Sequence, residues 1–202
     1  MPSHILSDLR RWTARSGVSG GALALLLAAA LSAPATASAS TDSTPSPTGK
    51  EDPHRYCVRV YGTAASATEA SPLRYTYCST EGREDAYANL NSPATQARLG
   101  RYVTFASRDL LMTWYENANY NIDEGDQTDI YGDEGPCDSA GYRIAPNSDW
   151  DDNISSIAGT AACTKARLTN RSLDYAETQS LPTPYVGDRL NDNIGLIHVY
   201  NG

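Results

Sequence analysis

The segment Asp151-Asp152-Asn153-Ile154-Ser155-Ser156 lies between Trp150 and Ile157 and is the most informative part of the sequence. Three side chains with carboxylate or amide oxygens are followed by one apolar residue and two hydroxyls, a pattern typical of a tight turn leading into a strand. Hard cations bind carboxylate, amide and hydroxyl oxygens together with free backbone carbonyls. The segment therefore predicts a turn that offers the ligands of a divalent cation, although such residues also form turns without an ion.

A weaker copy of this segment, Asn191-Asp192-Asn193-Ile194-Gly195-Leu196, follows forty residues later and lacks both hydroxyls. Short β-favouring runs surround the two copies, separated by clusters of Asn, Asp, Gly and Pro. We expect strands within residues 101–107, 110–115, 130–131, 141–144, 155–157, 166–169, 184–186 and 195–200. Short strands at this spacing predict a mainly β fold, an antiparallel sandwich or barrel.

The preceding part of the chain, residues 54–109, has a different pattern. Residues 56–61 and 73–78 alternate with period two, which predicts a β-hairpin. Residues 83–90 have a helical pattern with Ser79 or Thr80 as the candidate N-cap, and Pro93 ends or restarts the helix. We expect this hairpin and helix to extend the sheet of the following domain, or to cap its edge, because so short a segment has only a small core of its own.

The chain has four cysteines, Cys57, Cys78, Cys137 and Cys163. No CxxC pair is present, so two disulfides are favoured over a metal site. Four cysteines allow three connectivities, and the sequence does not choose among them. Pairing of neighbours would close two loops of similar size and would join the two strands of the predicted hairpin.

The first 39 residues have the features of a secretory signal peptide. A basic stretch precedes an apolar run of about a dozen residues, too short to span a membrane, and small residues follow up to the expected cleavage site after Ala39. Residues 40–53 contain no large apolar side chain, so we expect a disordered linker there. The mature protein is therefore predicted to be secreted, where an oxidising environment favours disulfides.

Acidic side chains outnumber basic ones, 24 to 16 in the whole chain. Without residues 1–39 the counts are 23 and 13, a net charge of −10, which disfavours nucleic acid and anionic membranes as partners. Eleven of the acids lie between Glu116 and Asp152, with Arg143 as the one basic residue there. The sequence after residue 39 has two histidines, His54 and His198, and no HExxH, GxSxG or phosphate-loop motif, so we expect no catalytic activity.

The C-terminal part, residues 110–202, resembles the βγ-crystallins, in particular their secreted bacterial members. Tyr115-Glu116-Asn117-Ala118-Asn119-Tyr120 is similar to the aromatic hairpin of that family, and the segment Asp151 to Ser156 matches its calcium signature at every position. The resemblance implies a double Greek-key domain, and it places Cys137 and Cys163 where secreted members often have a bridge. Ile122 stands where the family's hairpin has Gly, so we expect a remodelled or lengthened hairpin.

The resemblance also implies a calcium site that draws ligands from both halves of the domain. The implied ligands are Asp151, Asp152, Asn153 through its carbonyl, and Ser155 through its hydroxyl, with Glu116, Asn191, Asp192 and Asn193 as secondary candidates. Because Gly195 lacks a hydroxyl, we expect one usable site of weak to moderate affinity. Calcium would then stabilise a monomeric domain outside the cell.

A second functional class follows from the same resemblance. Some secreted actinobacterial proteins of this fold inhibit proteases, and others resemble killer toxins. An inhibitor needs a rigid exposed loop, for which the segments 133–136 and 181–184 are candidates. A cell-surface component is a further candidate partner, without a residue-level case.

Overall fold

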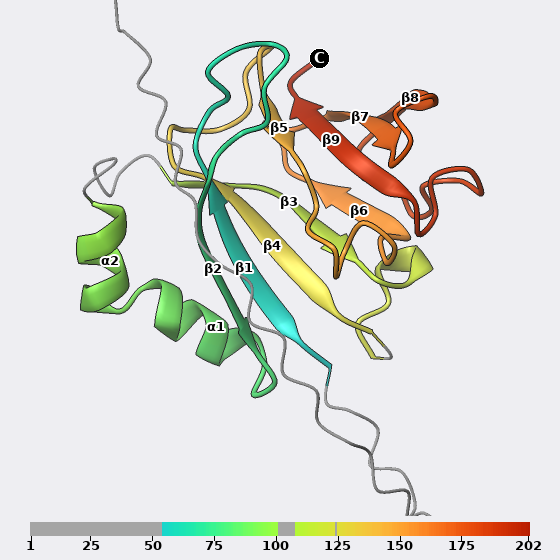
Figure 1. Cartoon of the computed structure of the whole chain (residues 1–202). Helices are drawn as coiled ribbons and strands as arrows, with labels where there is room; N and C mark the ends of the chain where they lie inside the picture. Colours follow the sequence, from blue (N-terminus) through green and yellow to red (C-terminus); the bar gives the residue numbers. More distant parts are fainter. Residues whose placement is uncertain (1–53, 101–107, 124) are drawn as a thin grey trace, which may run out of the picture. The chain divides into compact units, whose positions relative to one another are not determined.

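The computed structural model describes residues 54–100, 108–123 and 125–202. The predicted signal peptide, the linker and the expected strand at 101–107 lie outside the described residues. Within them the chain is mainly β, with two sheets and two α-helices (Figure 1). None of these helices is long and apolar enough to cross a membrane.

The first sheet contains the predicted hairpin. Its strands, in spatial order, are β2 (Leu73–Ser79), β1 (Tyr56–Tyr61), β4 (Gln127–Gly132), β3 (Asp109–Tyr115) and β6 (Ser156–Gly159). All neighbours are antiparallel except β1 and β4, which run parallel. The N-terminal hairpin therefore extends the sheet of the following domain through β1.

The helices pack on the hairpin. Helix α1 (Arg83–Leu90) contacts β1 and β2, and α2 (Pro93–Leu99) follows it directly. Alternate residues of β1 and β2 and the apolar residues of both helices form a second, smaller core. Its members are Tyr56, Val58, Val60, Tyr75, Ala86, Leu90 and Leu99.

The second sheet has the order β5 (Tyr142–Ile144), β9 (Ile194–Tyr200), β7 (Lys165–Asn170) and β8 (Ala176–Ser180), all antiparallel. Strand β5 lies between β4 and β6 in sequence but belongs to this other sheet. In return Thr183, which lies between β8 and β9, pairs with Ile157 of β6 as an isolated bridge. Each half of residues 109–202 thus places three strands in one sheet and contributes a fourth segment to the other.

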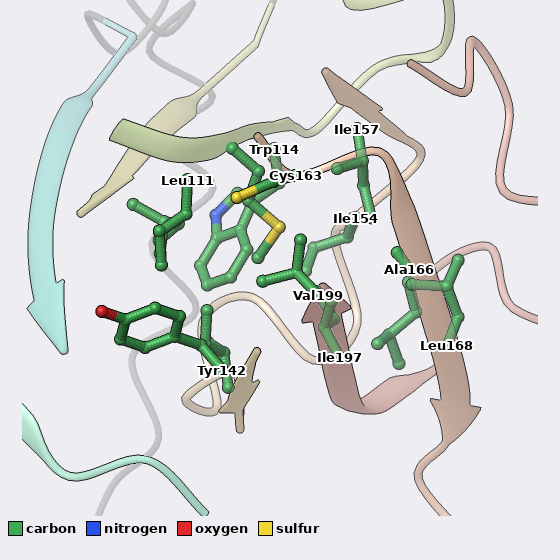
Figure 2. Packing of buried hydrophobic residues seen from close by; sticks show 14 of the residues in the cluster. Leu111, Trp114, Tyr142, Ile154, Ile157, Cys163, Ala166, Leu168, Ile197 and Val199 are labelled. Atoms are coloured by element: carbon green, nitrogen blue, oxygen red, sulfur yellow. The ribbon is translucent and has the colours of Figure 1, made fainter. Parts of the chain in front are cut away.

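The main hydrophobic core contains buried residues of both sheets. Trp114 and Trp150 lie with ring centroids 5.8 Å apart. Ile154, Ile157, Leu168 and Val199 belong to the same buried cluster as Trp114 (Figure 2). These side chains are at most 2% exposed. Full burial of such a side chain stabilises the fold by about 1.5–3 kcal/mol, so this core provides a large share of the folding free energy.

Both disulfides join sequence neighbours. Cys57 and Cys78 are register partners in the β1–β2 hairpin, and Cys137 is bonded to Cys163. The pairing that the sequence left open is therefore the one with two loops of similar size. Disulfides are compatible with an extracellular location.

The structure corrects three expectations of local structure. Residues 184–186 form no strand, and the sheet pairing next to them is the single bridge at Thr183. Strand β8 was not predicted, because its residues Ala-Glu-Thr-Gln-Ser are polar and lie at a sheet edge. Helix α1 begins after Gly82, at φ 106°, without a side-chain cap, since Ser79 Oγ instead accepts a hydrogen bond from Glu81 N.

Candidate metal site

The two six-residue segments fold into turns of the same shape. Trp150 N and Leu190 N each donate to the carbonyl three residues earlier, at 2.8 and 2.9 Å. The side-chain amides of Asn153 and Asn193 each donate, through Nδ2, to the backbone carbonyl four residues earlier, at 2.7 and 3.2 Å. The segment at 191–196 is therefore a structural repeat of the segment at 151–156.

The two turns are bonded to each other through their backbones. Ile194 N donates to Asp151 O at 2.9 Å, and Asp192 N donates to Ile154 O at 3.4 Å. Ile154 and Ile194 are both completely buried beneath them. This reciprocal arrangement brings side chains from the two halves of the domain into one place.

Oxygen-bearing side chains converge beside the first turn. Burial raises the pKa of Asp192, and the negative charges of Asp152 and Glu116 raise it further. Hydrogen bonding to the Ser155 hydroxyl and to Asn191 acts in the opposite direction. Asp192 is therefore influenced by two carboxylates and one hydroxyl from distant parts of the chain.

The hairpin after β3 holds Glu116 in this position. Glu116 Oε2 accepts a hydrogen bond from Asp126 N at 2.8 Å. A Cβ at Gly125 would lie only 2.4 Å from Asn117 Nδ2, so the Asn117 side chain would have to shift to admit another residue there. Gly125 stands three residues beyond Ile122 and lies against this hairpin.

Ser156 links this hairpin to the first turn. Its Oγ donates to Asn117 O at 2.6 Å and accepts from Tyr120 N at 3.1 Å. The rings of Tyr115 and Tyr120 contact each other edge to face, with centroids 5.7 Å apart. The last hydroxyl of the segment therefore positions the hairpin, whereas Ser155 lies beside Asp192.

The corresponding place beside the second turn has the opposite charge. Arg171 follows β7 directly, as Glu116 follows β3, and its Nε lies 3.3 Å from Asp151 Oδ2 and its Nη1 3.9 Å from Asp152 Oδ2. A Cβ at Gly195 would lie 2.8 Å from the Cα of Arg171, so a serine does not fit there without a shift. The guanidinium group of Arg171 therefore offsets the negative charges of Asp151 and Asp152 beside the second turn.

The structure separates the sequence-derived candidates into two groups. Glu116, Asp152, Ser155 and Asp192 come together, and Asn153 lies in the same turn. The side chains of the other three have different partners: Asp151 pairs with Arg171, Asn193 donates to Arg189 O, and Asn191 donates to Asp192 Oδ2 at 2.6 Å. Asp152 also lies beside Arg171, 3.9 Å from its Nη1. Sequence reasoning missed Arg171, although its place directly after a strand, where the first half has Glu116, was a usable signal.

The donor set suits a hard cation. In the part of the chain that the structure describes, no three or more His, Cys, Asp and Glu side chains form a metal-binding group by themselves. A site at the first turn would combine carboxylate oxygen with the Ser155 hydroxyl and the Asn153 carbonyl. Such all-oxygen sets favour calcium or magnesium over thiolate- or imidazole-binding metals.

The two segments considered as inhibitory loops are only partly exposed. Asp133 is 4% exposed and Thr183 is 7% exposed, so each segment has one side chain packed against the domain.

Comparison of the chain with protein-family models, with curated proteins and with solved structures finds no match.

Proposed function

We propose that the protein is a secreted calcium-binding β module whose residues 109–202 form a double Greek-key domain of the βγ-crystallin kind. The exchange of segments between the sheets supports this fold. Strand β5 pairs with β9 in the second sheet, and Thr183 pairs with β6 in the first. In a Greek key the fourth strand returns by a long connection to lie beside the first, as β6 lies beside β3 and β9 beside β7.

The convergence of Glu116, Asp152 and Asp192 around Ser155 carries the calcium proposal. Like charges held together destabilise a folded protein unless a cation offsets them. Burial and these neighbours raise the pKa of Asp192, so its ionised form is less favourable here than in a free aspartate. Calcium binding at this place would relieve the repulsion and stabilise the domain.

The proposed ligands are the Ser155 hydroxyl, the Asn153 carbonyl, the Asp192 carboxylate and Glu116. The ion would bridge the two halves, because Asp192 belongs to the second turn and the others to the first half. Beside the second turn the positive charge of Arg171 pairs with Asp151, where a cation would otherwise be needed. We therefore expect one calcium ion per chain, with Kd on the order of 10⁻⁵ to 10⁻³ M as in extracellular modules.

Calorimetric titration and thermal melting test this proposal. The intact protein, stripped with a chelator, should release or absorb heat on calcium addition with a stoichiometry of one, and its Tm should rise. Ser155→Ala should weaken binding at least tenfold, whereas Ser66→Ala, which removes an exposed hydroxyl elsewhere, should leave it unchanged. Absence of both calcium heat and a Tm change would overturn the proposal.

A further inference from the structure

A separate cavity of about 420 Å³ lies beside the second sheet. The loop between β1 and β2 forms one wall with Thr63 and Ala67, and the segment before β5 forms another with Asp138 and Ser139. Arg143 of β5 and His198 of β9 also line it. The cavity shares no residue with the candidate metal site.

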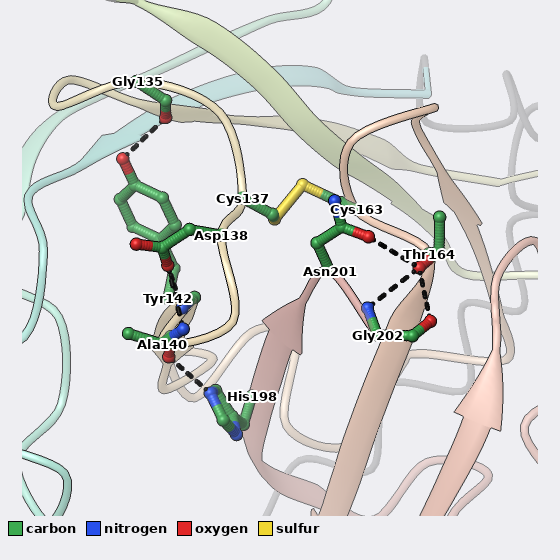
Figure 3. The surroundings of a disulfide bond; sticks show 11 residues. Gly135, Cys137, Asp138, Ala140, Tyr142, Cys163, Thr164, His198, Asn201 and Gly202 are labelled. Atoms are coloured by element: carbon green, nitrogen blue, oxygen red, sulfur yellow. Dashed lines mark hydrogen bonds between the residues drawn. A yellow bond between two sulfur atoms is a disulfide. The ribbon is translucent and has the colours of Figure 1, made fainter.

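The walls of this cavity are held in place by several independent contacts. The β1–β2 loop is bonded to β5, since Ser71 N donates to Arg143 O at 2.7 Å and Arg143 N donates to Ser71 Oγ at 3.0 Å. The opposite segment follows directly on the disulfide at Cys137 (Figure 3). Asp138 Oδ1 accepts the N–H groups of the residues two and three positions later, at 2.9 and 2.8 Å. The cavity is therefore preformed rather than a gap between loose loops.

Basic side chains gather on the sheet face at this cavity. Arg143 is the register partner of His198, and His198 is the register partner of Arg167 on its other side. Direct partners on antiparallel strands have side chains on the same face, so these three form one row across β5, β9 and β7. Lys165 lies two residues before Arg167 on the same face and is the register partner of Tyr200. The ring of Tyr200 stacks on that of His198, with centroids 4.9 Å apart.

Within the described residues no ion pair joins an acidic side chain to this row. Arg55, Arg74, Arg83 and Arg171 form ion pairs there, whereas Arg143, Lys165 and Arg167 do not, and Lys165 Nζ donates to Ser180 Oγ at 2.8 Å. Arg143 Nε is moreover buried and has no hydrogen-bond partner among the described groups. An unpaired basic row in a chain of net charge −8 therefore indicates a place for an anion.

We propose that this cavity binds a small organic carboxylate, with Arg143 and His198 as the residues that contact the carboxyl group. The planar guanidinium of Arg143 matches a carboxylate in charge and geometry. His198 Nε2 lies 2.7 Å from Ala140 O, which fixes the ring beside Arg143. Asp138 is the one acid in the lining, and its Oδ1 is already engaged by two backbone groups. The volume is at the lower end of small-molecule sites, enough for a monosaccharide or a terminal residue of a peptide.

Titration of the isotope-labelled intact protein with two pairs of probes tests this proposal. Glucuronate is compared with glucose, and N-acetyl-alanine with N-acetyl-alaninamide, by amide chemical shifts. We expect millimolar binding of at least one acid, roughly tenfold tighter than its neutral analogue, with shifts centred on Arg143 and His198. Binding of glucuronate alone would identify an acidic sugar, and equal binding of both acids would identify the carboxylate itself.

Two variants and one control complete the test. Arg143→Gln should weaken binding about tenfold, and Ala67→Trp, on the exposed loop, should block the cavity without changing the sheet. Arg98→Gln, which removes an exposed charge on α2, should bind as the unmodified protein does. Equal binding of acids and neutral analogues, shifts elsewhere, no binding at 50 mM probe (roughly tenfold above the weakest affinity expected), or unchanged binding in both variants would overturn the proposal.

Discussion

Arg171 Nε lies 3.3 Å from Asp151 Oδ2, so an ion pair joins the end of β7 to the turn of the other half. Glu116 has the corresponding place after β3. The repeated architecture thus has an acidic group at one position and a basic group at the other. This difference explains why two turns of the same shape need not bind two ions.

Arg171→Gln should lower the stability of the calcium-free protein while leaving the calcium stoichiometry at one. The arginine side chain is about half exposed, so the expected loss is only about 0.5–1 kcal/mol. Chemical unfolding in chelator and calorimetric titration measure the two effects. Binding of a second calcium ion by this variant would show that Arg171, rather than the missing hydroxyl at Gly195, prevents calcium binding at the second turn.

Calcium affinity should fall as the pH is lowered through the raised pKa of Asp192. The proton competes with the cation for this carboxylate, so affinity is constant above that pKa and decreases below it, by up to tenfold per pH unit. Titrations at a series of pH values test this. Asp192→Asn should bind calcium weakly at every pH and lose the pH dependence in this range.

Asp192→Asn should also stabilise the calcium-free protein at neutral pH. Burial, Asp152 and Glu116 raise the pKa of Asp192 above its unfolded value, so the folded state binds this proton more tightly than the unfolded state does. The free energy of unfolding of the calcium-free protein therefore increases as the pH falls through the raised pKa of Asp192. An uncharged asparagine at this position should give the same increase at every pH. Melting in chelator at pH 7 compares the two proteins, and a lower Tm for the variant would contradict this reasoning.

Asp129→Ala should strongly destabilise the fold. This carboxylate is 1% exposed and accepts a hydrogen bond of 2.5 Å from the Thr113 hydroxyl, besides bonds from the hydroxyls of Tyr56 and Tyr87. Removal leaves these buried donors without their acceptor, at a cost of about 3–5 kcal/mol. Urea unfolding measures the loss. Tyr56→Phe, which removes a single donor, should cost only about 1 kcal/mol.

Replacement of both Cys57 and Cys78 by alanine should lower stability without affecting calcium. The bridge closes a sequence separation of 21 residues. By restricting the unfolded chain, a loop of this size contributes about 3 kcal/mol to the free energy of unfolding. The candidate ligands lie in other segments, so the calcium heat should be unchanged. A simultaneous loss of calcium binding would mean that the hairpin supports the site directly.

The sequence allowed prediction of those elements whose pattern is local. The alternation in β1 and β2 and the helical period of residues 83–90 each depend on neighbours within a few positions. Strand β8 has polar, exposed residues and therefore no such pattern. Its existence depends on pairing with β7, which only the folded chain provides.

The first turn of the candidate site was predictable from the residues themselves, whereas Glu116 and Asp192 were expected only from the resemblance. The oxygen-rich residues at 151–156 are contiguous, whereas the approach of Asp192 to Ser155 depends on the backbone bonds between the two turns. The role of Arg171 likewise depends on the return of β7 beside β9. Long-range charge placement of this kind follows from topology rather than from local composition.

The parallel pairing of β1 with β4 has a consequence for solubility. Without residues 54–79, β4 would present an open row of N–H and C=O groups, which is a template for pairing with another chain. The hairpin covers that row, and its outer strand β2 is joined to β1 by a disulfide and packed against α1. The N-terminal segment therefore covers the edge of β4, and we expect a shortened chain beginning at residue 109 to form oligomers through that strand.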